Sequence, residues 1–527
     1  MGRWLAVLLL VLAAAAATVL AVLDPWWWLL AAPALAPALL GVHDLLQRRH
    51  SILRNYQVVG HLRFLLESIR PELQQYFVER NVDGRPYDRD TRNVIYERAK
   101  GIHGEQAFGT EREVNEVGYE YLLHSTKPAP QSDTPPKVRI GGPDCTRPYE
   151  MALLNVSAMS FGALSANAIQ ALNKGAALGG FAHDTGEGGL TSHHLRHGGD
   201  LIWEIGSGYF GARTQDGDFD PDVFRDKSAH DAVKLVSLKL SQGAKPGIGG
   251  VLPGAKVTPE IADARGVPVG EKCVSPPYHR VFSTPRELVL FIARMRELAG
   301  GKPAGFKLCV GSRVEFLGIC KAMLEEGVTP DFIVVDGSEG GTGAAPLEFE
   351  DHVGVPLTEG LLFVHNALVG TGLRERIKIG ASGKVATGTD IVKRLVQGAD
   401  YTNAARAMMM AVGCIQAQRC HTNTCPVGVA TQDPRRARAL VVPDKAQRVH
   451  RFQEGTVAQA LQIISAMGLT SPAQLQPHML QRRIDHVTTR GYDEVYDWLQ
   501  PGELVHGARE PWAKDWERAS ADVFVPL

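Results

Sequence analysis

Short apolar runs that alternate with amphipathic stretches are the feature that most constrains how this chain can fold. They begin near residue 146, and glycine-rich turns separate them. Helical patterns lie between several runs, and Thr284–Leu298 opens with the helix-start signal Thr-Pro-Arg-Glu. Strands that alternate with helices predict parallel βα units. The runs predicted to be strands are ALLNVS, LIWEIG, VSLKLS, GFKLCV, FIVVDG, IKIGAS and YTNAAR, which start at residues 152, 201, 236, 305, 332, 377 and 401.

About seven or eight such units over roughly 290 residues fit an α/β fold, a (β/α)8 barrel with insertions, better than a doubly wound sheet. We assign residues 146–440 to this barrel. Residues 46–145 are polar and mixed, suggest a helix over 64–77, and are expected to form an N-terminal extension that packs on the barrel. Residues 441–527 are expected to form a mostly helical C-terminal extension.

The first 45 residues are far more apolar than the rest of the chain. Trp4–Leu23 holds no charged residue and is long enough to span a bilayer as a helix. A second apolar stretch, Trp26–Val42, starts with three tryptophans, but Pro33 and Pro37 make a re-entrant segment an alternative to a full span. We predict a transmembrane hairpin over residues 1–45. A signal peptide is the alternative interpretation of the first apolar stretch, Trp4–Leu23.

Charges and cysteines indicate on which side of the membrane the main body of the chain lies. Arg3 precedes the apolar segment and Arg48, Arg49 and Arg54 follow it, so both ends of the hairpin are expected on the cytoplasmic side of a membrane. Seven cysteines without a disulfide pattern fit a reducing compartment. The balance of 56 Lys and Arg against 57 Asp and Glu argues against a nucleic-acid partner.

Several predicted strands end in residues suited to ligand binding, and ligands of such barrels gather at those ends. Lys239 and Lys245 stand in one glycine-rich stretch, and Lys307 lies inside a strand, where its charge needs an anion. Backbone N–H groups of Gly383 and Lys384, with the guanidinium of Arg406, are suited to a phosphate. Each stretch alone could be an ordinary turn. Together, a phosphate seat on one side and lysines on the other suit flavin mononucleotide (FMN).

Two further patterns are less specific. Gly206–Gly211 matches the dinucleotide fingerprint, but no helix pattern follows it, so we interpret it as a loop. Cys414, Cys420 and Cys425 have the spacing C-x5-C-x4-C, with His421 nearby. The spacing alone is compatible with zinc, with an iron–sulfur cluster or with three unconnected cysteines.

Several longer runs are specific enough to name a family. Between about Arg85 and Arg436 the chain resembles the flavin-binding synthase domain of glutamate synthase, and as a whole it resembles the stand-alone, membrane-anchored bacterial relatives of that domain. The runs that carry the resemblance are MSFGALS, HDTGEGG, EIGSGYFG, LSQGAKPG, SPPYH, GGTGAAP and CHTNTCPVGVATQ.

The resemblance implies a TIM barrel with FMN and a 3Fe-4S cluster held by Cys414, Cys420 and Cys425. It also implies an oxidoreductase acting on CH–NH2 donors, in which 2-oxoglutarate and ammonia give 2-iminoglutarate and reduced FMN delivers hydride to C2. Lys245 and Arg265 would hold substrate carboxylates, and Glu187 would line the site and assist ammonia entry or proton transfer. The implied FMN-binding residues are Ser157, Met159, Ser160, Lys239, Lys307, Gly340, Gly341, Gly383, Lys384 and Arg406.

Two departures from the family pattern leave more than one substrate and function open. Ile248 and Val251 stand in AKPGIGGVLPG where the long enzymes read AKPGEGGQLPG, so a related 2-oxo acid could replace 2-oxoglutarate. No amidotransferase sequence is recognised, so ammonia is expected from solution or from a separate glutaminase subunit, and electrons from a separate donor. The alternative functions are an FMN and iron–sulfur dehydrogenase of amino acids or amines that feeds a membrane partner, and a non-catalytic electron relay.

Overall fold

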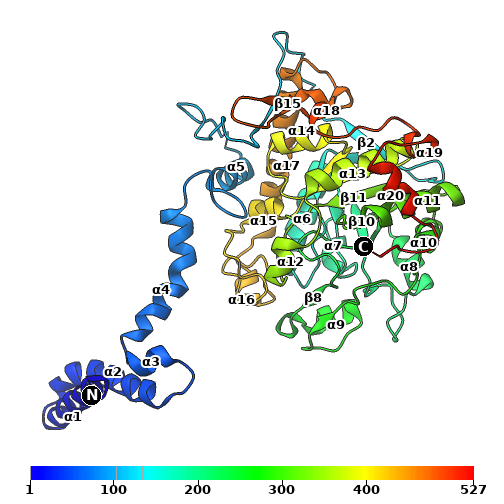
Figure 1. Cartoon of the computed structure of the whole chain (residues 1–527). Coiled ribbons are helices and arrows are strands. Elements are labelled where there is room, and N and C mark those ends of the chain that lie inside the picture. Colours follow the sequence, from blue (N-terminus) through cyan, green and yellow to red (C-terminus); the bar gives the residue numbers. More distant parts are fainter. Residues whose placement is uncertain (1, 103, 133, 527) are drawn as a thin grey trace. The chain divides into compact units, whose positions relative to one another are not determined.

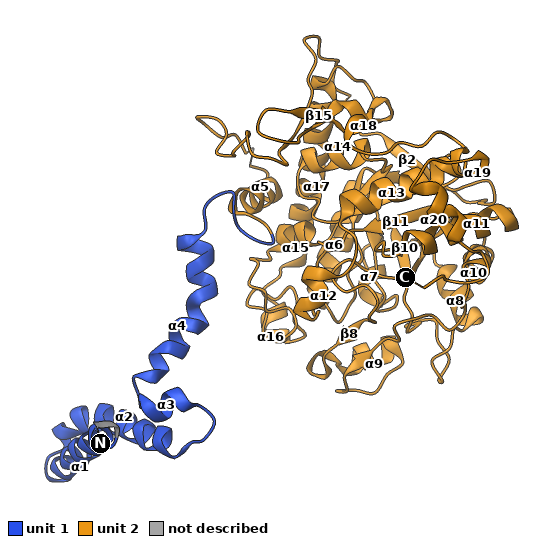
Figure 2. Ribbon diagram, viewed as in Figure 1, with its two compact units in different colours: residues 1–86 blue, residues 87–527 orange. Residues whose placement is uncertain are grey.

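The computed structural model describes residues 2–102, 104–132 and 134–526. It divides into two compact units, Met1–Pro86 and Tyr87–Leu527 (Figure 2). Each unit has its own packing, and the candidate site lies entirely within the second.

Two apolar helices pack against each other in the first unit. Small side chains, including Ala14, Ala21, Ala31 and Ala38, are buried between them. Trp4–Leu23 and Pro25–Leu46 are long and apolar enough to cross a membrane, which is typical of a membrane anchor and also of a signal sequence. The second helix continues through Pro33 and Pro37 without a break. The helices of this unit are α1 (Gly2–Leu23), η1 (Pro25–Trp27), α2 (Trp28–Leu46), α3 (Ser51–Asn55), α4 (Gly60–Leu73) and the π-helix η2 (Gln74–Val78).

A closed barrel of eight parallel strands forms the centre of the second unit (Figure 1). The barrel closes where β13 pairs with β4. The predicted barrel fold is therefore confirmed. One strand, β5, is only two residues long, so no apolar run in the sequence predicted it. The strands are β4 (Leu154–Val156), β5 (His183–Asp184), β6 (Leu201–Ile205), β7 (Val233–Lys239), β10 (Ala304–Leu308), β11 (Phe332–Asp336), β12 (Lys378–Ser382) and β13 (Tyr401–Ala404).

Helices cover the outside of this barrel, and local signals set where they begin. The Thr284 side chain accepts a hydrogen bond from the Glu287 N–H, and Pro285 occupies the first turn. The helix predicted at Thr284–Leu298 is thus present one residue later. The covering helices are α6 (Ala166–Gly179), α7 (Ser192–Leu195), α8 (Pro221–Ser228), α10 (Pro285–Leu298), α11 (Arg313–Glu326), α12 (Leu347–His352), α13 (Leu357–Gly370), α14 (Gly388–Val396) and α15 (Arg406–Val412).

Insertions and extensions complete the unit. The hairpin of β2 (Lys137–Ile140) and β3 (Tyr149–Ala152) contributes Ile140 and Met151 to the apolar cluster inside the barrel. Between β7 and β10, the chain inserts β8 (Val251–Leu252), η3 (Gly254–Lys256), α9 (Pro259–Arg265) and β9 (Cys273–Val274).

The terminal extensions are helical in part, and they also share a small sheet. In it β1 (Glu120–Leu122) pairs with β14 (Leu480–Arg483), which pairs with β15 (Thr489–Gly491). Sequence patterns gave no sign of a pairing between segments so far apart. The remaining helices are α5 (Arg89–Lys100), α16 (Pro434–Ala437), α17 (Val442–Ala466), η4 (Pro472–Gln474), η5 (Pro477–Met479), α18 (Tyr492–Val495), α19 (Glu503–His506) and α20 (Trp512–Arg518).

Candidate active site

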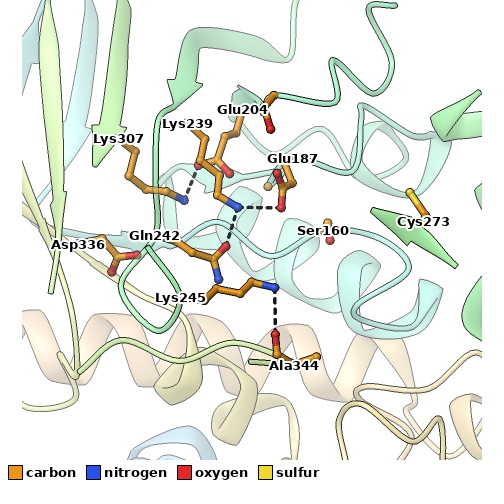
Figure 3. Close-up of polar contacts among 12 residues, drawn as sticks. Ser160, Glu187, Glu204, Lys239, Gln242, Lys245, Cys273, Lys307, Asp336 and Ala344 are labelled. Atoms are coloured by element: carbon orange, nitrogen blue, oxygen red, sulfur yellow. Dashed lines mark hydrogen bonds and ion pairs between the residues drawn. The ribbon is translucent and has the colours of Figure 1, made fainter. Parts of the chain in front are cut away.

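Lys239 and Glu187 form the centre of the polar site at the carboxyl ends of the barrel strands (Figure 3). Lys239 is the last residue of β7, and Glu187 follows β5 in a glycine-rich turn. The Lys239 ammonium donates to Glu187 Oε1 at 2.7 Å and to Gln242 Oε1 at 2.5 Å. A Cβ at Gly250 would collide with Glu187 Oε1, so the bare backbone of the inserted loop is what allows this close approach.

Glu187 is held in its ionised form. Burial acts to raise the pKa of its carboxyl, but Lys239, Arg265 and Lys245 together outweigh burial and set the pKa below its usual value. Three cations therefore surround one carboxylate. The surplus of positive charge suits an anionic ligand.

Lys245 and Arg265, the predicted carboxylate-binding residues, both lie near this pair. Lys245 Nζ donates to Ala344 O at 2.9 Å, and burial, aided by the Lys239 charge, lowers its pKa to about 8. Arg265 ends α9, donates to Phe161 O at 3.1 Å and to Ser160 Oγ at 3.4 Å, and lies over the Phe210 ring. The structure thus brings Glu187, Lys239, Lys245, Arg265 and Ser160 to one end of the barrel.

Lys307 lies deeper in the barrel and has a partner from the chain itself. Its ammonium is 2.5 Å from Glu204 Oε2, and both side chains are almost fully buried. Burial would lower the pKa of Lys307, but Glu204, Asp184 and Asp336 outweigh burial and raise it. The anion that this buried lysine requires is therefore Glu204 in the structure.

Two aspartates complete this buried charge network. Burial, reinforced by the Glu204 charge, raises the pKa of Asp184 well above its usual value. Burial also raises the pKa of Asp336, which accepts a hydrogen bond from Gly243 N at 3.0 Å. Lys307 thus faces three acids inside the barrel, and burial favours the neutral form of two of them, Asp184 and Asp336.

Sequence reasoning missed Glu204, Asp184, Asp336 and Gln242. The signal for Glu204 was available, since it is the single charged residue of the otherwise apolar run LIWEI. The argument applied to Lys307, that a charge in a buried strand needs an opposite charge, applies equally to this glutamate.

The predicted phosphate seat lies at the ends of the neighbouring strands β11, β12 and β13. Gly383 and Lys384 follow β12 with φ of +151° and +51°, a backbone path that turns sharply at the strand end. Arg406 begins α15, donates to Glu339 O at 2.7 Å and lies over the Tyr87 ring. A Cβ at Gly341 would come within 2.7 Å of the Arg406 side chain, and one at Gly340 within 2.9 Å of Gly337 O.

Two serines link this seat to the start of the barrel. Ser157 follows β4 and its Oγ lies 3.2 Å from Ser382 Oγ at the end of β12. The buried Met159 and the half-buried Ser160 lie against the turn at Gly186, where a Cβ would lie 2.7 Å from Ser160 N. Backbone donors, an arginine and glycine-lined space at adjacent strand ends fit the phosphate and ring of a flavin mononucleotide.

The three cysteines lie on the loop that follows α15. Burial, and to a smaller extent the other two thiols, raises the pKa of Cys414 to about 12, and burial also raises the pKa of Cys420. Cys425 is buried. In residues 2–102, 104–132 and 134–526, no three His, Cys, Asp or Glu side chains are arranged to hold a single metal ion.

Lys256 lies beside these cysteines. It is buried and donates to Ala163 O at 2.9 Å. Burial lowers its pKa to about 8, while Cys420 and Cys425 act in the opposite direction. Cys425 is buried and Cys414 and Cys420 are half-buried. Three cysteine side chains near a buried cation are a donor set compatible with a thiolate-bound, negatively charged cluster.

Comparison with known proteins agrees with this geometry. A family described as the conserved region in glutamate synthase matches residues 144–470. A glutamate synthase large subunit-like protein of Bacillus subtilis, YerD, is 38% identical over 497 residues, covering 86% of this chain and 94% of that protein. An archaeal-type NADPH glutamate synthase of Thermotoga neapolitana is 34% identical over 321 residues, covering 61% of this chain and 60% of that protein.

Solved structures resemble the chain only distantly. A flavocytochrome b2 mutant with bound pyruvate has a TM-score of 0.41 and 13% identity, covering 86% of this chain and 98% of that one. That likeness is too weak to support a functional comparison. The family match and the high coverage of YerD are sufficient by themselves: the chain belongs to the glutamate synthase family and is a glutamate synthase-type oxidoreductase.

Proposed function

We propose that this protein reductively aminates 2-oxoglutarate or a related 2-oxo acid, with ammonia supplied from outside the chain. The observation that carries the proposal is the ionised Glu187 among Lys239, Lys245 and Arg265 at the barrel mouth. In the reaction, the oxo acid and ammonia lose water to form a C=N bond. Two electrons and the accompanying protons then convert that bond to an amine.

The cationic side chains are suited to substrate binding. Lys245 and Arg265 would pair with carboxylates of the oxo acid and orient its carbonyl carbon. Glu187, being ionised at neutral pH, would accept a proton from the incoming ammonium or stabilise a positively charged C=N group.

FMN is the cofactor that the family and the strand-end donors support. When bound, FMN supplies hydride chemistry at the substrate carbon. Gly383, Lys384 and Arg406 would hold its phosphate, with Gly340 and Gly341 giving room. Lys239 and Lys307 would face the ring, where Lys239 shares its charge with Glu187 and Lys307 with Glu204. Ser157, Met159 and Ser160 would contact it from the end of β4.

Cys414, Cys420 and Cys425 would hold a 3Fe-4S cluster that passes electrons toward the flavin. Purified without oxygen, the protein is expected to contain about one FMN and about three iron atoms per chain. Cys425→Ser should lose most of the iron and retain the flavin, because the phosphate seat lies on other residues. Cys145→Ser, in a loop where Sγ donates to Gly301 O, is the matched control and should retain both. Iron retained in Cys425→Ser would remove that ligand assignment.

Helices α1 and α2 are proposed to anchor the protein in the bacterial inner membrane, with the barrel in the cytoplasm. Their apolar length and the flanking Arg48, Arg49 and Arg54 support this orientation. The anchor would hold the enzyme near a membrane-bound electron donor. A separate glutaminase subunit or free ammonium would supply the nitrogen.

The central test is a flavin reoxidation experiment. The protein is reduced without oxygen and mixed with 2-oxoglutarate or other 2-oxo acids, each with ammonium or with methylamine. We expect fast reoxidation only when an oxo acid and a nitrogen donor are both present. Ile248 and Val251 are half-buried on either side of Gly249 and Gly250. Because they replace polar residues of the long enzymes, they support one alternative function, an amino-acid or amine dehydrogenase. Reduction of the oxidised enzyme by an amine, with no reoxidation by any mixture, would establish that alternative instead.

A further inference from the structure

The segment after the hairpin carries an apolar surface that its own unit, residues 1–86, leaves exposed. Helix α4 runs directly into η2, so residues 60–78 form one helical segment. Its large apolar side chains lie at spacings of three and four, which places them along one face. They are exposed by 40% to 83%, and they are Leu62, Leu65, Leu66, Ile69, Leu73, Tyr76 and Phe77. We call these seven residues the apolar stripe.

The opposite face of α4 differs in character. Phe64 points away from the stripe, and its ring contacts the His50 ring edge-on, with centroids 5.4 Å apart. Arg63 and Glu67 also lie off the stripe and form an ion pair of 2.8 Å. The contacts of α4 with the rest of its unit lie near its start, and the apolar stripe is left exposed.

A buried contact ties the start of α4 to the end of α2. Asp44, in the last turn of α2, is fully buried and accepts a hydrogen bond from Val58 N at 2.9 Å. The same carboxylate lies 2.9 Å from His61 Nε2, in the first turn of α4. If α2 crosses a bilayer, α4 must therefore begin at the level where α2 leaves it. In Figure 2, α4 then runs away from the hairpin instead of packing along it.

The charges around this segment suit an anionic lipid surface. Between residues 47 and 73 the chain carries five arginines and two glutamates. Arginines near a membrane surface are attracted by anionic headgroups. Arg63 and Arg70 lie at one edge of the apolar stripe on the helix. Lipid headgroups would lie at this edge if the stripe entered lipid.

We infer that α4 and η2 form an amphipathic helix that lies in the bilayer interface, with the apolar stripe in the acyl-chain boundary. Such helices combine a broad apolar face with basic residues beside it. The inference rests on the proposed anchoring by α1 and α2, and it adds a second, in-plane attachment directly after the hairpin. The occupant of the stripe is thus lipid, and not a second protein chain.

The test uses the full chain in nanodiscs that contain anionic lipid. An environment-sensitive NBD dye is attached to Leu66→Cys in the stripe, and to Glu67→Cys one residue further on, where it lies off the stripe. Leu12→Cys in α1 reports on the anchor. Protein with only its native cysteines gives the background. Quenching by lipids spin-labelled near the headgroup, by lipids spin-labelled deep in the acyl chain and by aqueous iodide is measured for each.

We expect the Leu66→Cys dye to be quenched by spin-labelled lipid, shifted to the blue and protected from iodide. The Glu67→Cys dye should be quenched by iodide. If the Leu12→Cys dye is reached by iodide and not by lipid quenchers, the anchor is wrong and this inference is wrong with it. If Leu12→Cys lies in lipid while Leu66→Cys behaves like Glu67→Cys, only the interfacial helix is wrong. A Leu66→Cys dye protected from the lipid quenchers and from iodide would show that protein covers the stripe and would also overturn the inference.

Discussion

Glu187→Gln is expected to slow flavin reoxidation by 2-oxo acid and ammonium by about 10²–10⁴-fold, the usual contribution of a positioned acid–base group. Glutamine keeps the size of the side chain and can still accept the hydrogen bond from Lys239. It removes the negative charge that can take up a proton or stabilise a cationic C=N group. Stopped-flow measurement of flavin absorbance after anaerobic reduction gives the rate directly.

The matched control for this change is Glu454→Gln, an exposed acid on α17. It should leave the rate unchanged. Flavin content should be the same in both variants, because the phosphate seat does not involve Glu187. If Glu187→Gln reoxidises as fast as the unchanged protein with ammonium at saturating and at low concentration, Glu187 has no part in the chemistry.

Lys307→Met is expected to destabilise the barrel by about 3–5 kcal/mol, the cost of leaving a buried charge without its partner. The change removes the buried cation that offsets Glu204, Asp184 and Asp336 in the barrel interior. Chemical unfolding in detergent, followed by tryptophan fluorescence, measures the loss. The loss should shrink at lower pH, because protonation can neutralise the acids that the lysine had balanced.

A double variant separates two causes of the lost stability, the uncompensated charge and the lost packing of the lysine stem. Adding Glu204→Gln to Lys307→Met removes the uncompensated carboxylate, so much of the lost stability should return. The alternative outcome, equal destabilisation in the single and double variants, would mean that lost packing of the lysine stem dominates. In that case the ion pair would not be what holds these strands together.

The barrel was predictable because its signals are local. Apolar runs and capping residues such as Thr284 are read over a few neighbours in the chain, and they located seven strands and the helix of Pro285–Leu298. The two-residue strand β5 gave no such signal. The sheet that joins β1 to β14 also gave none, since its pairing connects residues about 120 and 480.

The sequence motifs named residues of the site, but they did not predict the ion pairs between those residues. The motifs around Glu187, Lys239, Lys245 and Arg265 indicated which residues would gather at the barrel mouth. They did not indicate that Lys239 pairs with Glu187, or that Lys307 has Glu204 as its counter-charge. Choosing between partners requires distances between strands that are far apart in sequence.

The sequence by itself determined the alternation of strands and helices, the apolar hairpin segment and the family, because each depends on residue order and short-range spacing. Only the tertiary structure decided which buried charges meet, which carboxyls have a raised pKa and that the apolar stripe of α4 stays exposed. The physical reason is that Coulomb attraction and desolvation depend on separation and burial. Both are fixed only when the barrel closes and its strand ends come together.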